Sequence, residues 1–257
     1  MKQANRTKSQ FVWHDLVTFE VENAIRFYSD LLGWECKGYD MGGPDKYHMI
    51  HIGDKRIGGF MKPQKDNIPS HWIGYISINN LEVAASSITD LKGNILVEPT
   101  DIPDIGKFAI ARDDYGAVFA LFATNEDTPT ENEPPGNLEF CWNEYLAEDL
   151  EKSKAFYEKI FGWNFSSMSK VPGMNYWLAK AGDREIAGIT NLPKLQFSSN
   201  QWLIYIKITN IDDLTARVPN LGGRIIKEPF NITDHTKASI IEDSVGARIG
   251  LFEDSKD

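Results

Sequence analysis

Two acidic residues each follow a tryptophan by two positions, in stretches that nearly repeat one another. Asp15 follows Trp13 in FVWHDL, and Glu144 follows Trp142 in FCWNEY. If both stretches are β-strands, each acid shares a face with its tryptophan, because side chains alternate along a strand. A carboxyl group desolvated beside an indole has a raised pKa, which suits a general acid or base. The same pattern fits a ligand-contacting acid, or a buried acid hydrogen-bonded to a neighbouring strand or to backbone amides.

The repetition extends over most of the chain. Residues 11–34 match residues 140–163 at an offset of 129, and after one inserted residue the match continues at an offset of 130. This pattern indicates a duplicated domain. Residues 125–137 are rich in acids and prolines, which predicts an exposed linker. We therefore expect two domains, residues 1–124 and 138–257. Matching positions include Tyr47/Tyr176, Gly59/Gly188, Trp72/Trp202, Tyr75/Tyr205 and Phe122/Phe252.

Each copy is expected to contain two βαβββ units in series. Apolar alternation predicts the strands, and a period of 3.6 residues predicts the helices. In the first copy the expected strands are 11–19, 35–40, 47–52, 56–61, 72–78, 95–98, 107–112 and 118–122, and the expected helices are 21–32 and 81–91. Each unit buries one sheet face under its helix. Two units side by side would curve the other face into a trough suited to a small ligand.

Composition and charge restrict the partners. The formal net charge of −10 argues against nucleic acid and against an anionic membrane surface. No apolar run approaches the roughly 20 residues that span a bilayer, and the first residues lack the apolar middle of a signal peptide. Cys36 and Cys141 are out of register with the repeat, so we expect reduced, packed thiols in a cytoplasmic protein.

The combined pattern resembles the vicinal oxygen chelate superfamily, which includes glyoxalases, bleomycin resistance proteins and extradiol dioxygenases. The resemblance is carried by the paired βαβββ units, by FY-x-x-x-x-GW at residues 27–34 and 156–163, and by D-x-x-G at residues 113–116 and 243–246. It covers nearly all of both copies. It implies an α+β fold with four βαβββ units, which form two tandem glyoxalase/bleomycin-resistance/dioxygenase-type domains. The openings WHDL and WNEY resemble a tandem-domain glyoxalase-like subgroup.

The resemblance also implies where a metal would be bound. Metal-using members hold a divalent ion with a side chain from the first strand of each unit, usually His, and one from the last strand, usually Glu. The corresponding positions are Trp13, Ile73 and Ala120 in the first copy, and Trp142, Leu203 and Gly250 in the second. None of these side chains can ligate a metal, so we expect no metal and no cofactor. A shifted alignment would leave Zn, Ni, Mn or Fe as the alternative. His14 should point away from the Trp13 face.

Repeated aromatic residues and their neighbours are candidates for the walls of the troughs. The predicted ligand-binding residues are Trp13, Phe60, Met61, Trp72, Tyr75, Trp142, Trp202 and Tyr205. Core packing is the alternative for the fifth-strand aromatics, and Trp72 in particular is expected to pack against a helix or the partner domain. Met41 and Met174 lie in loops that are long enough to overhang the troughs.

Three functions follow as alternatives. The first is a metal-free protein that binds small molecules in two troughs. The second is a metal-dependent glyoxalase-like lyase, isomerase or dioxygenase acting on a small oxygenated metabolite, with Asp15 or Glu144 as catalytic general base. The third is a non-catalytic interaction module. Duplication makes the pairing of the two domains intramolecular, so we expect a monomer or a homodimer.

Overall fold

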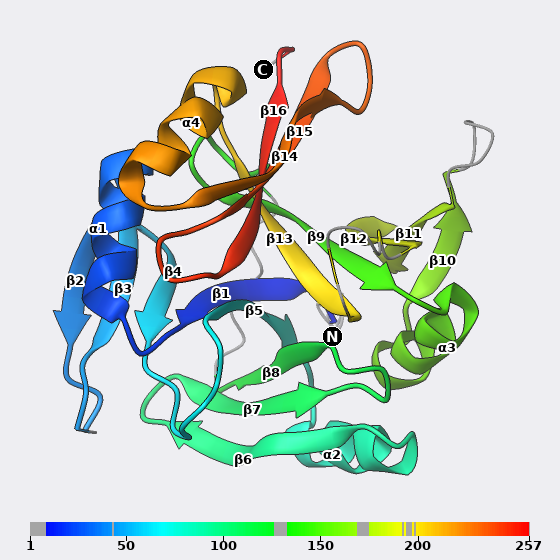
Figure 1. Ribbon diagram of the computed structural model, residues 1–257. Helices are drawn as coiled ribbons and strands as arrows, with labels where there is room; N and C mark the ends of the chain where they lie inside the picture. The colour runs from blue at the N-terminus through cyan, green and yellow to red at the C-terminus, as the bar shows by residue number, and fades with distance from the viewer. Residues whose placement is uncertain are drawn as a thin grey trace. The chain divides into compact units, whose positions relative to one another are not determined.

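The computed structural model describes residues 9–42, 44–125, 133–168, 175–191, 193, 197 and 199–256. The predicted α+β fold with four βαβββ units is confirmed (Figure 1). The first copy contains β1 (Phe11–Val17), α1 (Val21–Leu32), β2 (Glu35–Tyr39), β3 (Tyr47–Ile52), β4 (Lys55–Met61), β5 (His71–Ser77), α2 (Leu81–Asp90), β6 (Asn94–Ile102), β7 (Gly106–Arg112) and β8 (Val118–Thr124). The second contains β9 (Phe140–Ala147), α3 (Leu150–Phe161), β10 (Asn164–Ser167), β11 (Tyr176–Ala181), β12 (Arg184–Asn191), β13 (Gln201–Lys207), α4 (Ile211–Arg217), η1 (Val218–Leu221), β14 (Arg224–Asn231), β15 (Thr236–Glu242) and β16 (Arg248–Asp254).

We call the four βαβββ units modules 1 to 4, in chain order, beginning at β1, β5, β9 and β13. Within every module the first strand pairs in parallel with the fourth. The strand orders are β2-β3-β4-β1-β5-β8-β7-β6 and β10-β11-β12-β9-β13-β16-β15-β14. Strand β6 extends past the expected 95–98 because two irregularities in its pairing with β7 hide its alternation.

The described residues group into two compact units that cross the boundary between the copies. Unit 1 comprises the described parts of Met1–Val12, Gly74–Glu133 and Trp142–Trp202, and therefore combines modules 2 and 3. Unit 2 comprises Trp13–Ile73, Pro134–Cys141 and Leu203–Asp257, and combines modules 1 and 4. Each unit thus takes one module from each copy. The domain limits 1–124 and 138–257 describe the repeat and stay a prediction. Part of the predicted linker, 126–132, lies outside the described residues.

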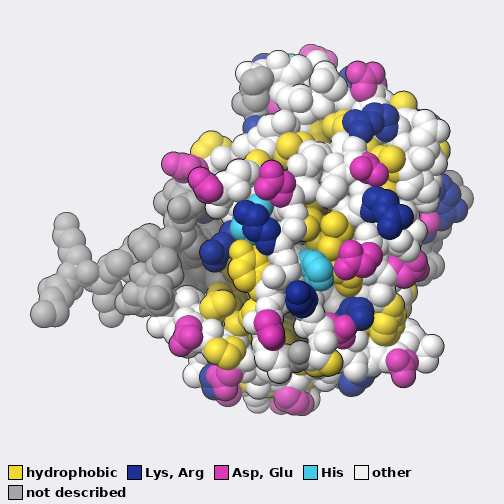
Figure 2. All heavy atoms as spheres, turned by 90° about the vertical axis from the view of Figure 1, so that its left-hand side faces the viewer, with side chains coloured by type: hydrophobic (Ala, Val, Ile, Leu, Met, Phe, Trp, Pro, Cys, Tyr) yellow, Lys and Arg dark blue, Asp and Glu magenta, His cyan; other side chains and the backbone are white. Residues whose placement is uncertain are grey.

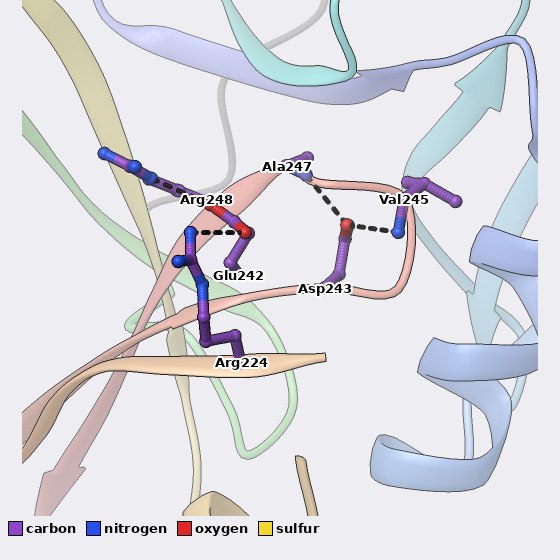
Figure 3. Close-up of polar contacts among 6 residues, drawn as sticks. All are labelled: Arg224, Glu242, Asp243, Val245, Ala247 and Arg248. Carbon is purple, nitrogen blue, oxygen red and sulfur yellow. Dashed lines mark hydrogen bonds and ion pairs between the residues drawn. The ribbon is translucent and has the colours of Figure 1, made fainter. Parts of the chain in front are cut away.

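An aromatic cluster with a buried acid forms the core of unit 2, where Figure 1 shows α1 and α4 side by side. The Tyr28 hydroxyl donates to Asp243 Oδ2 at 2.9 Å and accepts a hydrogen bond from Trp72 Nε1 at 2.8 Å. Asp243 Oδ1 accepts the backbone N–H groups of Val245 and Ala247 at 3.0 and 2.8 Å (Figure 3). Tyr28 belongs to the FY motif and Asp243 to the D-x-x-G motif, so these motifs join modules 1 and 4.

Unit 1 repeats this arrangement with its own residues. Tyr157 and Tyr145 donate to Asp113 Oδ2 at 3.0 and 2.6 Å, and Trp202 Nε1 donates to Tyr157 at 2.9 Å. Asp113 Oδ1 accepts two backbone N–H groups of the turn at residues 113–117. Because each carboxylate both closes a turn and binds a tyrosine of the other copy, the two copies interlock reciprocally.

The face drawn in Figure 2 carries acidic and basic side chains interspersed with small hydrophobic patches, rather than a basic strip. Among the helices in the described part of the chain, none has the length and apolar character needed to cross a membrane.

Candidate functional site

The Trp13 and Asp15 side chains lie on one face of module 1, as expected from strand alternation. Asp15 is in register with Gly59 of β4, and Gly59 is in register with Met49 of β3. Trp13, Tyr47 and Met61 each lie two positions from one of these residues along their strands, so they share this face. We call it the Trp13 face. Leu16, Ile50 and Phe60 occupy the opposite face and are fully buried in the unit 2 core.

A hydrogen-bonded triad forms on the Trp13 face. Trp13 Nε1 lies 3.0 Å from Asp15 Oδ1 and 2.8 Å from the Tyr47 hydroxyl, to which it donates. Tyr47 in turn donates to the same Asp15 oxygen at 2.6 Å. Asp15 is only 3% exposed, whereas Trp13 and Tyr47 are half-buried. The polar edges of both rings therefore point at a buried acid, while part of each ring remains accessible.

Gly59 makes room for this triad. A Cβ atom placed on Gly59 would collide with the Tyr47 hydroxyl. A glycine within a strand allows another group to approach the backbone closely, and at Gly59 that group is the phenol of Tyr47. Gly188 has the same relation to Tyr176 in the second copy.

The second copy contains the equivalent triad in unit 1. Trp142 Nε1 donates to the Tyr176 hydroxyl at 2.9 Å, and the Tyr176 hydroxyl is hydrogen-bonded to Glu144. Burial, followed by the charge of Glu144, raises the pKa of Tyr176 well above its ordinary value. The phenol therefore stays protonated at neutral pH and acts as a hydrogen-bond donor to the carboxylate.

The two triads differ in burial and in the residues around them. Glu144 is half-buried, whereas Asp15 is buried. Met49 and Met61 flank the first triad, where they are half-buried; Leu178 and Thr190 hold the matching positions of the second. The first face is thus richer in flexible, polarizable thioethers than the second.

Tyr75 and Tyr205 are both buried, at 5% and 6% exposure. The Tyr75 ring lies 6.4 Å from that of Phe108, and Tyr75 is in register with Ala120. Tyr205 is in register with Gly250, and its ring covers Gly250 so closely that a Cβ there would collide with it. Their roles as ligand contacts stay a prediction.

Three of the predicted ligand-binding residues, Phe60, Trp72 and Trp202, lie in the cores of the two units. Phe60 is 0% exposed and lies 5.8 Å from Tyr28 and 6.0 Å from Trp72, ring to ring, on the face opposite Trp13. A ligand on the Trp13 face would not reach it. Trp72 and Trp202 bury their rings in the cores of units 2 and 1, where they donate to Tyr28 and Tyr157. Met61, in contrast, does lie on the Trp13 face.

The residues present do not fit the metal that the family implies. Trp13, Ile73 and Ala120 offer no ligand atom, and the Tyr205 ring overlies Gly250, where the last-strand ligand of the second copy would stand. Among the residues that the structure describes, no three His, Cys, Asp or Glu side chains form a group able to hold a metal ion. His14 is buried away from the Trp13 face, with its ring 4.5 Å from that of Phe140.

Tyr47 and Tyr176 were not among the residues predicted to form the sites. The signal was present, because both tyrosines and both glycines facing them recur in register. Met41 is exposed, and Met174 lies outside the described residues. A surface pocket lies elsewhere, beside the start of α1; its lining includes Phe19, Glu20, Asp45, Lys46 and Lys62. It contains none of the predicted site residues.

Comparisons with known proteins agree with this architecture. A family model described as Glyoxalase/Bleomycin resistance protein/Dioxygenase superfamily matches residues 10–121, and one described as Bleomycin resistance protein-like N-terminal matches residues 140–176. "Putative glyoxylase CFP32" of Mycobacterium tuberculosis (strain CDC 1551 / Oshkosh) is 30% identical over 249 residues, covering 94% of this chain and 93% of that protein. "Anthracycline biosynthesis protein DnrV" of Streptomyces peucetius is 21% identical over 256 residues, covering 94% and 92%.

Two solved structures share the fold. The Mn(II)-bound glyoxalase from Novosphingobium aromaticivorans has a TM-score of 0.62 at 11% identity, covering 96% of this chain and 82% of that one. The 2,2',3-trihydroxybiphenyl 1,2-dioxygenase from Sphingomonas wittichii strain RW1 has a TM-score of 0.64 at 11% identity, covering 96% and 90%. With four βαβββ modules in place and 30% identity to CFP32 over nearly its full length, the chain belongs to the glyoxalase/bleomycin resistance protein/dioxygenase superfamily, the vicinal oxygen chelate proteins, as a glyoxalase-like member.

Proposed function

We propose that this protein binds planar small organic molecules without a metal, against the Trp13 face and against the matching Trp142 face. The observation that carries the proposal is the triad in which Trp13 and Tyr47 direct their polar atoms at buried Asp15. Such a surface recognises a ligand by stacking and shape rather than by exchanging hydrogen bonds.

Two further observations support a small organic ligand. Trp13, Ile73 and Ala120 occupy the positions where metal-using relatives carry their metal ligands. These three side chains cannot hold an ion that would coordinate substrate oxygens. Two relatives are named as anthracycline biosynthesis proteins, and they match over 94% of this chain. A role with organic metabolites is consistent with those names.

Ligand-induced quenching of tryptophan emission tests the proposal. The full-length protein would be titrated with a panel of neutral, cationic and anionic aromatic compounds, and hits confirmed by calorimetry. We expect Trp13→Phe to remove the quenching that reports on the first copy, and Trp142→Phe to remove that of the second. Absence of binding across the panel would count decisively against the proposal.

A catalytic role for the two acids is the second candidate. Burial of Asp15 beside two hydrogen-bond donors favours it, because a carboxylate in a water-poor site is a usable general base. The test combines Asp15→Asn with Glu144→Gln and measures turnover of the hemithioacetal of methylglyoxal. Loss of turnover with retained ligand binding supports catalysis by these acids, and unchanged turnover rules it out.

A further inference from the structure

A second face in unit 2 carries an arginine beside Tyr205. Along β16, Ile249 and Leu251 are fully buried in the unit 2 core. Arg248 and Gly250 alternate with them and therefore lie on the opposite face, where the Tyr205 ring covers Gly250. Arg248 and Gly250 are separated by about 6.6 Å along the strand.

Glu242 holds this arginine in place (Figure 3). Arg248 Nε donates to Glu242 Oε2 at 3.2 Å, and Arg224 Nη2 donates to Glu242 Oε1 at 2.8 Å. One carboxylate therefore orients two guanidinium groups, and the trio carries a net charge of +1 in a chain of net charge −10. The side chain of Arg248 is 29% exposed, that of Glu242 is 19% exposed and that of Arg224 is 65% exposed.

The trio belongs to the second copy alone. The positions that match Arg224, Glu242 and Arg248 in the first copy are Asn94, Arg112 and Val118. The fold is therefore built without these charges in module 2, where a valine holds the place of Arg248. The Arg248–Glu242 ion pair is partly exposed and therefore adds little to stability.

We propose that Arg248 binds the carboxylate of a planar small molecule held against the Tyr205 face of the second copy. A guanidinium group donates two parallel hydrogen bonds to a carboxylate, and Glu242 fixes the plane in which it does so. Gly250, two residues further on, stands at the position that the family resemblance assigns to a metal-ligand residue, and Arg248 lies on the same face of β16. This inference rests on the proposed function of small-molecule binding.

Calorimetry with two ligands that share one ring system tests the inference. The probes are 1-naphthoate, which carries a carboxylate, and 1-naphthamide, which is neutral and nearly the same shape. We expect the full-length protein to bind 1-naphthoate at least about tenfold more tightly. Arg248→Met should abolish that preference and leave the affinity for 1-naphthamide within about twofold, while Arg248→Lys should retain part of it because the charge remains.

Arg26→Met is the control for net charge, because Arg26 is an exposed residue of α1. If Arg26→Met lowers the affinity for 1-naphthoate as much as Arg248→Met does, the preference for the carboxylate is a general charge effect and the inference is wrong. If both probes bind and Arg248→Met leaves their ratio unchanged, the inference fails while the proposed function stands. If neither probe binds the unmodified protein, both fail.

Discussion

The Tyr28 hydroxyl donates a 2.9 Å hydrogen bond to Asp243 Oδ2, although 215 residues separate the two along the chain. The equivalent bond in unit 1 joins Tyr157 to Asp113. In each pair the tyrosine lies in a helix of one copy, and the aspartate closes a turn of the other. Each of these bonds therefore joins a module of the first copy to a module of the second.

Tyr28→Phe tests this link. The substitution keeps the ring but leaves Asp243 Oδ2 without its donor and Trp72 Nε1 without its acceptor, both in a buried environment. A buried polar atom that loses its partner costs about 1–3 kcal/mol, so we expect the free energy of unfolding to fall by about 2–4 kcal/mol in denaturant titrations. Tyr39→Phe, at a half-buried position in β2, is the control and should change it by less than about 0.5 kcal/mol.

Asp243 should make stability depend on pH in an unusual direction. Burial raises its pKa from 3.8 to about 6, and hydrogen bonds from Ala247, Tyr28 and Val245 only partly oppose this. A raised folded-state pKa means that the folded protein binds the proton more tightly. The stabilising contribution is therefore complete below pH 3.8 and is lost as the pH rises through about 6.

Unfolding of the unmodified protein and of Asp243→Asn would be compared at pH 4 and pH 7. We expect the unfolding free energy of the unmodified protein, relative to the variant, to decrease by about 2 kcal/mol over this range. Asp234→Asn, at an exposed position, should show no such trend. A relative stability that stays constant or rises with pH would contradict the prediction.

Gly59→Ala should displace Tyr47 from Asp15. The added methyl group collides with the phenol hydroxyl, so either the ring or strand β4 must move. Overpacking of this kind costs about 1–3 kcal/mol, and we expect weaker ligand binding at the Trp13 face together with a shift in Trp13 emission as the indole loses its Tyr47 acceptor. Gly136→Ala, whose methyl group would meet only the end of the Glu139 side chain, is the matched control. Unchanged emission and affinity in Gly59→Ala would show that the triad does not form.

How far the sequence leads depends on the kind of feature. The period-2 pattern around Trp13 placed Asp15 on its face correctly, because alternation is a property of one strand. The Tyr47–Asp15 contact depends on the register of β1, β3 and β4, and a single-strand pattern carries no register. The burial of Phe60 in the unit 2 core was hard to predict, because the two glycines before it hide the alternation of β4. Arg248 has no counterpart in the first copy, where Val118 holds the matching position. Comparison of the two copies therefore could not single it out.

The two cysteines should react slowly. Burial raises the pKa of Cys36 to about 11, with a smaller contribution from Glu22, and burial raises that of Cys141 to about 12. Because the thiolate is the reactive form, we expect both thiols to react with a disulfide reagent at pH 8 at least about 100-fold more slowly than a free cysteine. In the chain unfolded in guanidinium, both thiols should react with the reagent at the rate of a free cysteine. A fast-reacting thiol in the folded protein would show that the packing around it opens.

We expect the purified protein to bind small molecules without a metal ion. Relatives that use an ion supply side-chain ligands where this chain has Trp13, Ile73 and Ala120, and the Tyr205 ring stands over Gly250 in the second copy. We therefore expect elemental analysis of the purified protein to find Zn, Ni, Mn and Fe well below one ion per chain, and dialysis against a chelator to leave ligand affinity unchanged. An ion that binds only the folded state raises the unfolding temperature by mass action. We expect none of these metals to raise it when added back. Stabilisation by one of these ions, or binding lost to the chelator and restored by the ion, would show that side chains outside these positions hold a metal after all.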